Sequence, residues 1–318
     1  MGFAILWVIS FHYSFLAGTP LGYFAEGGHL GVDIFVILSA FGLCFSLSKG
    51  GGYLHFIKKR VLRIVPTWWV LITAMLLVTV VLGRNNYPQS VFQYLCYYSG
   101  LGWWFYYDKH PGVYFYEWYI PTILLFYLFM PWLYRLSNRK LLLALLLSMA
   151  AGCLLLHFGV GGMLKLSFLR VPAFIYGIFL YRAYRVSQSV GGVKSLNVIY
   201  WVSSLVGVIG LLLLSFVFFD LRIAIQRYCF MLASPLLFSW AAILLGKLRL
   251  ERALSFVGTL TLELYLLHIY NLPLYAVMRF VGNRTISTVV VTVLLIGVAY
   301  IVSKAVSSTM KKVKIARN

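Results

Sequence analysis

Long apolar stretches recur along the whole chain and are separated by short polar segments. Most of them approach the ~20 residues with which a helix crosses the hydrocarbon core of a bilayer. Strand-like alternation is absent, and the lipid interior accepts only helices or closed barrels, so each stretch predicts a helix. We therefore predict an all-α polytopic membrane protein whose single membrane-embedded domain, residues 1–318, bundles about ten transmembrane helices. These are expected at residues 2–18, 30–48, 65–83, 118–136, 140–158, 169–185, 197–218, 223–246, 255–280 and 285–308.

Two of the connections carry a pattern of their own. Residues 49–64 begin with consecutive glycines and continue as a basic amphipathic turn, which predicts an interfacial helix on the cytoplasmic surface. Residues 84–117 form the longest outer loop and are rich in aromatic side chains. This loop either lies on the outer interface as an aromatic belt or covers a binding site.

Composition and charge agree with a membrane protein. Hydrophobic residues make up 62% of the chain and charged residues 11%, whereas a soluble domain has roughly 25% charged residues. The formal net charge is +20, but with ten spans the basic clusters all fall on one side of the membrane. That pattern predicts both termini in the cytoplasm and a multi-pass protein of the inner or plasma membrane. It also explains the basic excess by topology and lipid contact, so we expect no nucleic-acid partner.

The four cysteines show neither disulfide nor metal-ligand spacing, and no cluster of histidine, cysteine and acidic residues does so either. A serine nucleophile elbow and a phosphate-binding glycine loop are absent as well. The sequence therefore predicts no bound metal.

A histidine in the first apolar stretch is the first candidate for chemistry. A titratable ring is costly at membrane depth, so His12 predicts a functional site with a partner. Asp33 opens the second stretch at a similar depth, and a carboxylate orients a neutral imidazole and stabilises its protonated form. The alternatives are that Asp33 caps its helix and that His12 makes a structural hydrogen bond between spans.

A basic cluster before the third stretch is the second candidate. Lys59, Arg60 and Arg63 lie together, and the two arginines share a helix face because they are three residues apart. Guanidinium groups bind phosphates bidentately, so the cluster predicts a phosphate site. Anchoring to anionic lipid is the alternative.

Further polar residues are expected to line a cavity or to link helices by hydrogen bonds. Tyr265 and His268 share one helix face late in the chain, whereas Glu263 need not share it. The others are Glu117 and Trp118, which open the fourth span, and Arg170, which opens the sixth from outside.

Six short motifs follow one another in a recognisable order. They are Phe11-His12, the run from Gly31 to Phe41, the run from Phe56 to Pro66, Trp118 to Pro131 around Phe126-Tyr127-Leu128, Arg170 to Gly177, and Tyr265-Leu266-Leu267-His268. In this order the chain resembles the acyltransferase-3 family of integral membrane acyltransferases. The resemblance implies transfer of an acyl group, usually acetyl, from acyl-coenzyme A to a hydroxyl of a cell-surface or lipid-linked glycan. O-antigen, capsule and exopolysaccharide are examples of such cell-envelope glycans. His12 matches the family's first-span histidine, and Arg60 and Arg63 match its Arg-x-x-Arg pair.

Three positions depart from the family pattern. Met1 stands where the family has an arginine, so either the chain begins inside a longer first segment or this member lacks that arginine. The short first span favours the longer segment. Ala40 replaces a usual glycine, and Ile123 to Leu125 stand where many members carry a glutamate.

Together these features yield the hypothesis of a membrane O-acyltransferase. His12 is its general base, oriented by Asp33, and Lys59, Arg60 and Arg63 hold the phosphates of acyl-CoA. Tyr265, His268 or Arg170 polarises the thioester carbonyl or positions the acyl acceptor. The alternatives are a transporter or flippase of lipid-linked saccharides, and an inactive partner subunit.

Overall fold

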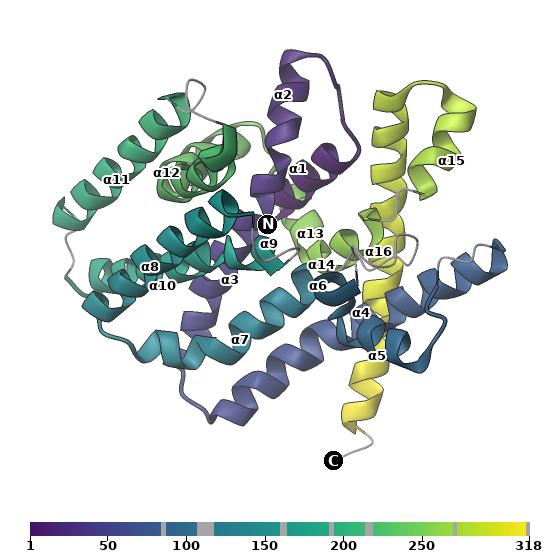
Figure 1. The fold of residues 1–318 in the computed structure, drawn as a ribbon, viewed down its shortest axis with the longest axis horizontal. Helices are drawn as coiled ribbons and strands as arrows, with labels where there is room; N and C mark the ends of the chain where they lie inside the picture. The colour runs from purple at the N-terminus through teal and green to yellow at the C-terminus, as the bar shows by residue number, and fades with distance from the viewer. Residues whose placement is uncertain are drawn as a thin grey trace. The chain divides into compact units, whose positions relative to one another are not determined.

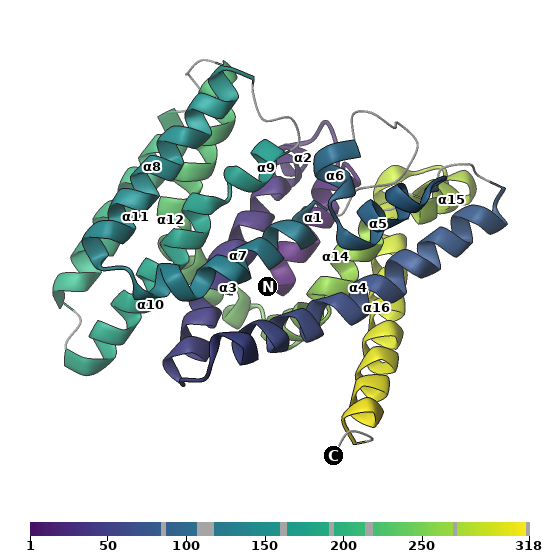
Figure 2. The ribbon, with the colours of Figure 1, turned by 60° about the horizontal axis from the view of Figure 1, so that its bottom comes forward.

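A computed structural model describes residues 1–83, 87–106, 118–159, 164–190, 194–213, 219–269 and 272–315, and every regular element in these ranges is helical (Figures 1 and 2). In chain order they are α1 (Gly2–His12), α2 (Pro20–Glu26), the 3-10 turn η1 (Gly27–Leu30), α3 (Gly31–Ser48), α4 (Tyr53–Val81), α5 (Val91–Ser99), α6 (Gly102–Tyr106), α7 (Tyr119–Arg135), α8 (Asn138–His157), α9 (Lys165–Phe168), α10 (Val171–Val190), α11 (Lys194–Leu213), α12 (Phe219–Lys247), α13 (Glu251–Thr259), α14 (Thr261–His268), α15 (Leu272–Val281) and α16 (Arg284–Ile315).

The expected all-helical membrane architecture is confirmed, but the count of about ten spans is not. Among the described residues six helical stretches are long and apolar enough to cross a bilayer, or seven if α14 and α15 form one broken span. α7 has 17 residues and α1 only 11. The expected span 255–280 consists of three shorter helices, α13, α14 and α15. The side of the membrane on which the termini lie stays a prediction.

The basic segment before the third span forms no separate interfacial helix, so this expectation was wrong. Gly50 and Gly51 turn the chain with φ of +79° and +116°, as predicted for a glycine hinge. From Tyr53 onward the helix runs without a break into the apolar stretch and ends at Val81. Once a helix has formed, each further residue with a backbone N–H adds one hydrogen bond. Glycine and proline are absent between Tyr53 and Val65, and Pro66 lies inside the helix without ending it.

Two compact units, each built from segments far apart in the sequence, make up the chain. Unit 1 comprises Met1–Val32, Lys58–Pro121 and Arg252–Asn318, and unit 2 comprises Asp33–Ile57 and Thr122–Glu251. The single domain stays a prediction.

In unit 1, helix α1 packs against α2, η1 and α14, while α14 and α15 pack against α16 (Figure 1). Gly28 permits the close approach of η1 to α1, because a Cβ atom there would overlap the carbonyl oxygen of Trp7. The indole of Trp7 donates a hydrogen bond of 2.7 Å to the carbonyl of Phe24. Contacts with three elements therefore hold α1 and with it the side chain at its end, His12.

The first helix ends earlier than the expected residue 18. Ser14 and Leu16 adopt φ of +50° and +51°, outside the helical region. Arg284 holds this turn, since its Nε donates to the Tyr13 carbonyl at 2.9 Å and its Nη2 to the Ser14 hydroxyl at 3.2 Å. A tertiary contact from the start of α16 thus stabilises the end of α1.

In unit 2, α11 runs along α12, and α8 packs against both α10 and α12 (Figure 2). Arg182 of α10 donates to the carbonyls of Tyr134 and Leu136 at 2.9 and 2.7 Å and to the side chain of Asn138. These bonds attach the turn between α7 and α8 to α10.

The interior of unit 2 contains a charged cluster of Asp33, Arg170 and Arg227, which are 1%, 2% and 6% exposed. Nη1 of Arg227 donates to Oδ2 of Asp33 at 2.8 Å, and Nε of Arg170 lies 3.6 Å from Oδ1. One carboxylate therefore compensates two guanidinium groups and links α3 to α12 and to the residue that precedes α10.

Replacing this carboxylate is expected to destabilise the protein. Asp33→Asn leaves two buried guanidinium groups without their counter-charge, so we expect the free energy of unfolding to fall by about 3–5 kcal/mol. Denaturation by SDS in mixed micelles measures the change. Lys140→Met, which removes an exposed charge, should stay within about 0.5 kcal/mol of wild type. Equal stability of both variants would contradict the role of Asp33.

Candidate active site

The structure divides the predicted site residues between the two units. Asp33 and Arg170 belong to unit 2. Glu117 lies outside the described residues. The remaining predicted residues all belong to unit 1 and are His12, Lys59, Arg60, Arg63, Trp118, Glu263, Tyr265 and His268.

His12 is the last residue of α1, and its side chain is exposed. Its ring lies at 5.0 Å, centroid to centroid, from the rings of both Phe11 and His268. Within the described ranges neither ring nitrogen has a hydrogen-bond partner in the protein. A substrate can therefore reach an imidazole whose position is set by ring packing.

His268, the last residue of α14, is completely buried at 0% exposure. Its Nδ1 lies 3.0 Å from the carbonyl oxygen of Leu264. A carbonyl only accepts hydrogen bonds, so Nδ1 carries the proton of the neutral ring and Nε2 carries the lone pair. Nε2 has no hydrogen-bond partner among the described residues. The site thus contains a buried basic nitrogen next to the accessible ring of His12.

Aromatic rings continue the row that His12 and His268 begin. The ring of Tyr265 lies 5.7 Å from that of His268 and 5.2 Å from that of Tyr119, and Tyr119 lies 6.0 Å from Trp118. Tyr265 is 4% exposed. The expectation that Tyr265 and His268 share a helix face is confirmed by this contact. Trp118 and Tyr119 extend the same wall from the start of α7.

The basic cluster lies in the first turns of α4. Lys59 and Arg63 are exposed, and Arg60 is partly exposed. Arg63 interacts electrostatically with the carboxylate of Glu263, which accepts a hydrogen bond from the Ser303 hydroxyl of α16. The cluster therefore presents accessible cations, and the charge of Arg63 acts on Glu263 of α14.

α14 connects the basic cluster with the histidine pair. Glu263 in its first turn interacts with Arg63, and His268 at its end contacts His12. Five residues separate Glu263 from His268, and a rise of 1.5 Å per residue places them about 7.5 Å apart along the helix axis. Residues from three distant parts of the chain, α1, α4 and α14, thus meet along one short helix.

Asp33 has the two arginines of unit 2 as its described polar contacts. Its expected pairing with His12 stays a prediction. Arg227 is a functional candidate that the sequence analysis did not single out. The signal was present, because a charge inside an apolar stretch is costly and marks a site. Arg227 was missed because the basic residues were interpreted as clusters in cytoplasmic loops, where their positive charge indicates only the topology of the chain.

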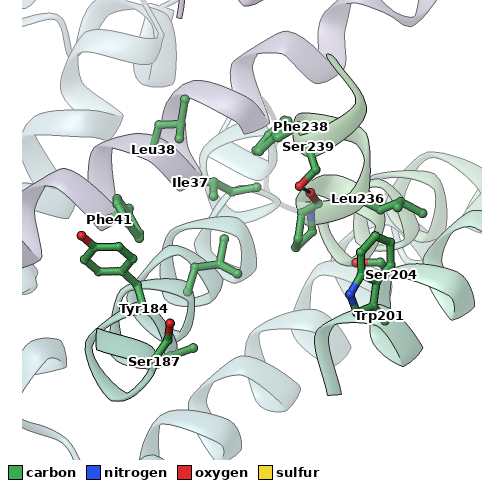
Figure 3. Close-up of a pocket in the computed structure, with 13 residues that line it drawn as sticks. Ile37, Leu38, Phe41, Tyr184, Ser187, Trp201, Ser204, Leu236, Phe238 and Ser239 are labelled. Carbon is green, nitrogen blue, oxygen red and sulfur yellow. Dashed lines mark hydrogen bonds between the residues drawn. The ribbon is translucent and has the colours of Figure 1, made fainter. Parts of the chain in front are cut away.

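Unit 2 also contains a cavity of about 480 Å³ between α3, α10, α11 and α12 (Figure 3). Its walls are mainly apolar, and hydroxyl groups come from Tyr184, Ser187, Ser204 and Ser239. None of the predicted site residues lines it. Its mainly apolar walls suit a hydrocarbon chain.

Comparison with known proteins identifies the family of the chain. The family model for the acyltransferase-3 domain, described as an acyltransferase domain, matches residues 2–307 and so nearly the whole chain. A search of curated proteins and a search of solved structures found no match. The match includes α1 with His12, the basic turns of α4 and all of α14. With its several membrane-length apolar helices, the chain belongs to the acyltransferase-3 family of membrane acyltransferases.

Proposed function

We propose that the protein transfers an acyl group, in the first instance acetyl, from acyl-CoA to a hydroxyl of a cell-surface or lipid-linked glycan. The observation that carries this proposal is that the accessible His12 ring, packed on His268, and the exposed basic residues of α4 belong to one compact unit. Acyl-CoA offers phosphates to bind at one end and a thioester to react at the other. The acyl acceptor stays a proposal based on the family.

His12 is the general base of this reaction. It takes the proton from the acceptor hydroxyl while the hydroxyl oxygen forms a bond to the thioester carbonyl carbon. The bond between carbon and sulfur then breaks, and the coenzyme A thiolate receives the proton from His12. Donor, acceptor and enzyme thus need no further reactant. The accessible ring of His12 and the absence of a competing described partner for its nitrogens support this role.

Lys59, Arg60 and Arg63 bind the phosphates of acyl-CoA. The guanidinium groups of Arg60 and Arg63 share a face of α4, and a planar fork of donors matches phosphate oxygens. Both arginines belong to unit 1, the compact unit that also contains His12 and His268. The donor phosphates and the reacting thioester are then bound within one compact unit.

The other residues are proposed to support the acyl acceptor and the thioester carbonyl. Tyr265 or Arg170 polarises the carbonyl or positions the acceptor, and Glu117 and Trp118 line the path to it. Asp33 stays a proposed positioning residue, and its contacts with Arg170 and Arg227 support a part in keeping Arg170 in position.

Removal of the base is expected to stop acyl transfer. His12→Ala should lower kcat by about 10²–10⁴-fold, the usual contribution of a general base. Thiol released from acetyl-CoA by the purified protein in lipid vesicles, with a total glycolipid extract as acyl acceptor, measures it. His157→Ala, which removes an exposed histidine at the end of α8, should keep the wild-type rate. Full activity of His12→Ala would remove His12 from the mechanism, and wild-type protein without thiol release would favour a transporter or an inactive subunit.

Removal of the phosphate site is expected to weaken donor binding. Arg60→Ala with Arg63→Ala should raise the KM for acetyl-CoA at least about tenfold with a smaller effect on kcat, because a hydrogen bond to a charged group contributes about 1.5–3 kcal/mol and exposure reduces that value. Initial rates of thiol release at varied acetyl-CoA concentration give both constants.

A matched double variant controls for the loss of two positive charges. Arg139→Ala with Lys140→Ala removes two exposed cations near the start of α8 and should leave KM unchanged. If both double variants raise KM equally, or neither does, Arg60 and Arg63 are lipid anchors.

A further inference from the structure

We propose that His268 positions His12 by accepting a hydrogen bond from it, so that the two imidazoles work as a pair in which only His12 exchanges protons with substrate. This inference rests on the proposed function, in which His12 is the general base. It assigns to a second histidine the orienting part that a carboxylate has in many base sites.

The two rings are close enough to bond. His12 ends α1 and His268 ends α14, and these helices pack against each other within unit 1. The ring centroids lie 5.0 Å apart at an interplanar angle of 63°. At this separation, ring nitrogens that point at each other fall within hydrogen-bond distance. The bond then requires that an N–H of the accessible His12 ring turn toward Nε2 of His268.

The backbone of α14 determines which way this hydrogen bond runs. Nδ1 of His268 donates to the Leu264 carbonyl at 3.0 Å, which leaves Nε2 as a lone-pair acceptor. Nε2 is buried and has no partner among the described residues. An unsatisfied buried acceptor is costly, so it favours a donor that approaches it. Among the described residues, the donors whose rings neighbour His268 are an N–H of His12 and the hydroxyl of Tyr265, and the His12 ring is the nearer, at 5.0 Å against 5.7 Å.

The difference in exposure separates the two roles. His268 is 0% exposed and makes no contact with solvent, whereas His12 is exposed. Two neighbouring charged groups have other partners. Glu263 accepts a hydrogen bond from Ser303 and interacts electrostatically with Arg63. Arg284 donates hydrogen bonds to the Tyr13 carbonyl and the Ser14 hydroxyl. Substrate thus reaches His12, while His268 acts only through it and is a positioning residue.

The pair suits the charge that develops during transfer. His12 presents one nitrogen to the acceptor hydroxyl and donates its other N–H to Nε2 of His268. When His12 takes up the proton it becomes an imidazolium with both N–H groups bonded, and it later gives the proton to the thiolate. His12 lies at the C-terminal end of α1, where the helix dipole also stabilises a positive charge. His268 ends the cycle unchanged.

Two substitutions separate the acceptor role of His268 from its volume. His268→Leu fills similar space without an acceptor, and His268→Gln places an amide oxygen near the position of Nε2. We expect His268→Leu to lower kcat for acetyl-CoA by about 10–100-fold, as loss of an orienting partner does, with KM unchanged. His268→Gln should recover most of this loss. Both variants lose the bond to Leu264, so their difference reports the acceptor alone.

The same substitutions in a His12→Ala background test whether His268 acts through His12. If it does, His268→Leu lowers the residual thiol release of His12→Ala no further. A reduction as large as in wild type, or equal losses for Leu and Gln, would overturn the proposal and make His268 structural. Retained activity of His268→Leu with inactive His12→Ala would overturn the pair alone, whereas active His12→Ala would overturn the proposed function itself.

A chemical probe tests the pair without relying on turnover. Diethyl pyrocarbonate reacts with accessible neutral imidazole nitrogens, and peptide mass spectrometry follows His12 separately from the other histidines. A partner that accepts the N–H of one nitrogen makes the other nitrogen a better nucleophile. We therefore expect severalfold slower modification of His12 in His268→Leu and a rate near wild type in His268→Gln. Equal rates in all three proteins would overturn the proposal.

Discussion

Burying a polar side chain among apolar helices costs free energy unless another polar group forms a hydrogen bond or an ion pair with it. This constraint determines where the chemistry of the protein lies. In unit 2 the carboxylate of Asp33 forms ion pairs with Arg170 and Arg227. In unit 1 the carbonyl of Leu264 accepts a hydrogen bond from Nδ1 of His268, and the hydroxyl of Ser303 donates one to Glu263. The Nε2 atom of His268 is one of several buried polar atoms without a hydrogen-bond partner among the described residues, and its neighbour His12 is the residue best suited to act as base.

The short helix α14 brings together residues from several parts of unit 1. Its first turn faces Arg63 through Glu263, its middle residue Tyr265 packs on Tyr119, and its last residue contacts His12. A helix of eight residues that ends at His268 lets one histidine be enclosed while its partner on α1 stays accessible.

The apolar pattern predicted the helices well and their ends poorly. Every expected span coincides with at least one helix, because stretches of apolar residues in lipid must satisfy their backbone internally. The boundaries depended on contacts that the pattern does not contain. Arg284 binds the turn after His12 and ends α1 early, and the basic segment joined α4 because nothing in its own residues stops a helix. Arg227 shows the same limit, since its charge was visible but its partner Asp33 lies 194 residues away.

The sequence by itself determined an all-helical membrane protein, its family, and the residue types that can carry proton transfer and phosphate binding. These follow from local composition, because lipid solvation and the family motifs both act on short segments. Only the tertiary structure decided the partners: Asp33 with two arginines, Arg63 with Glu263, and His12 with His268. Such pairings depend on how helices pack, and the energy of packing is shared among residues that are hundreds of positions apart.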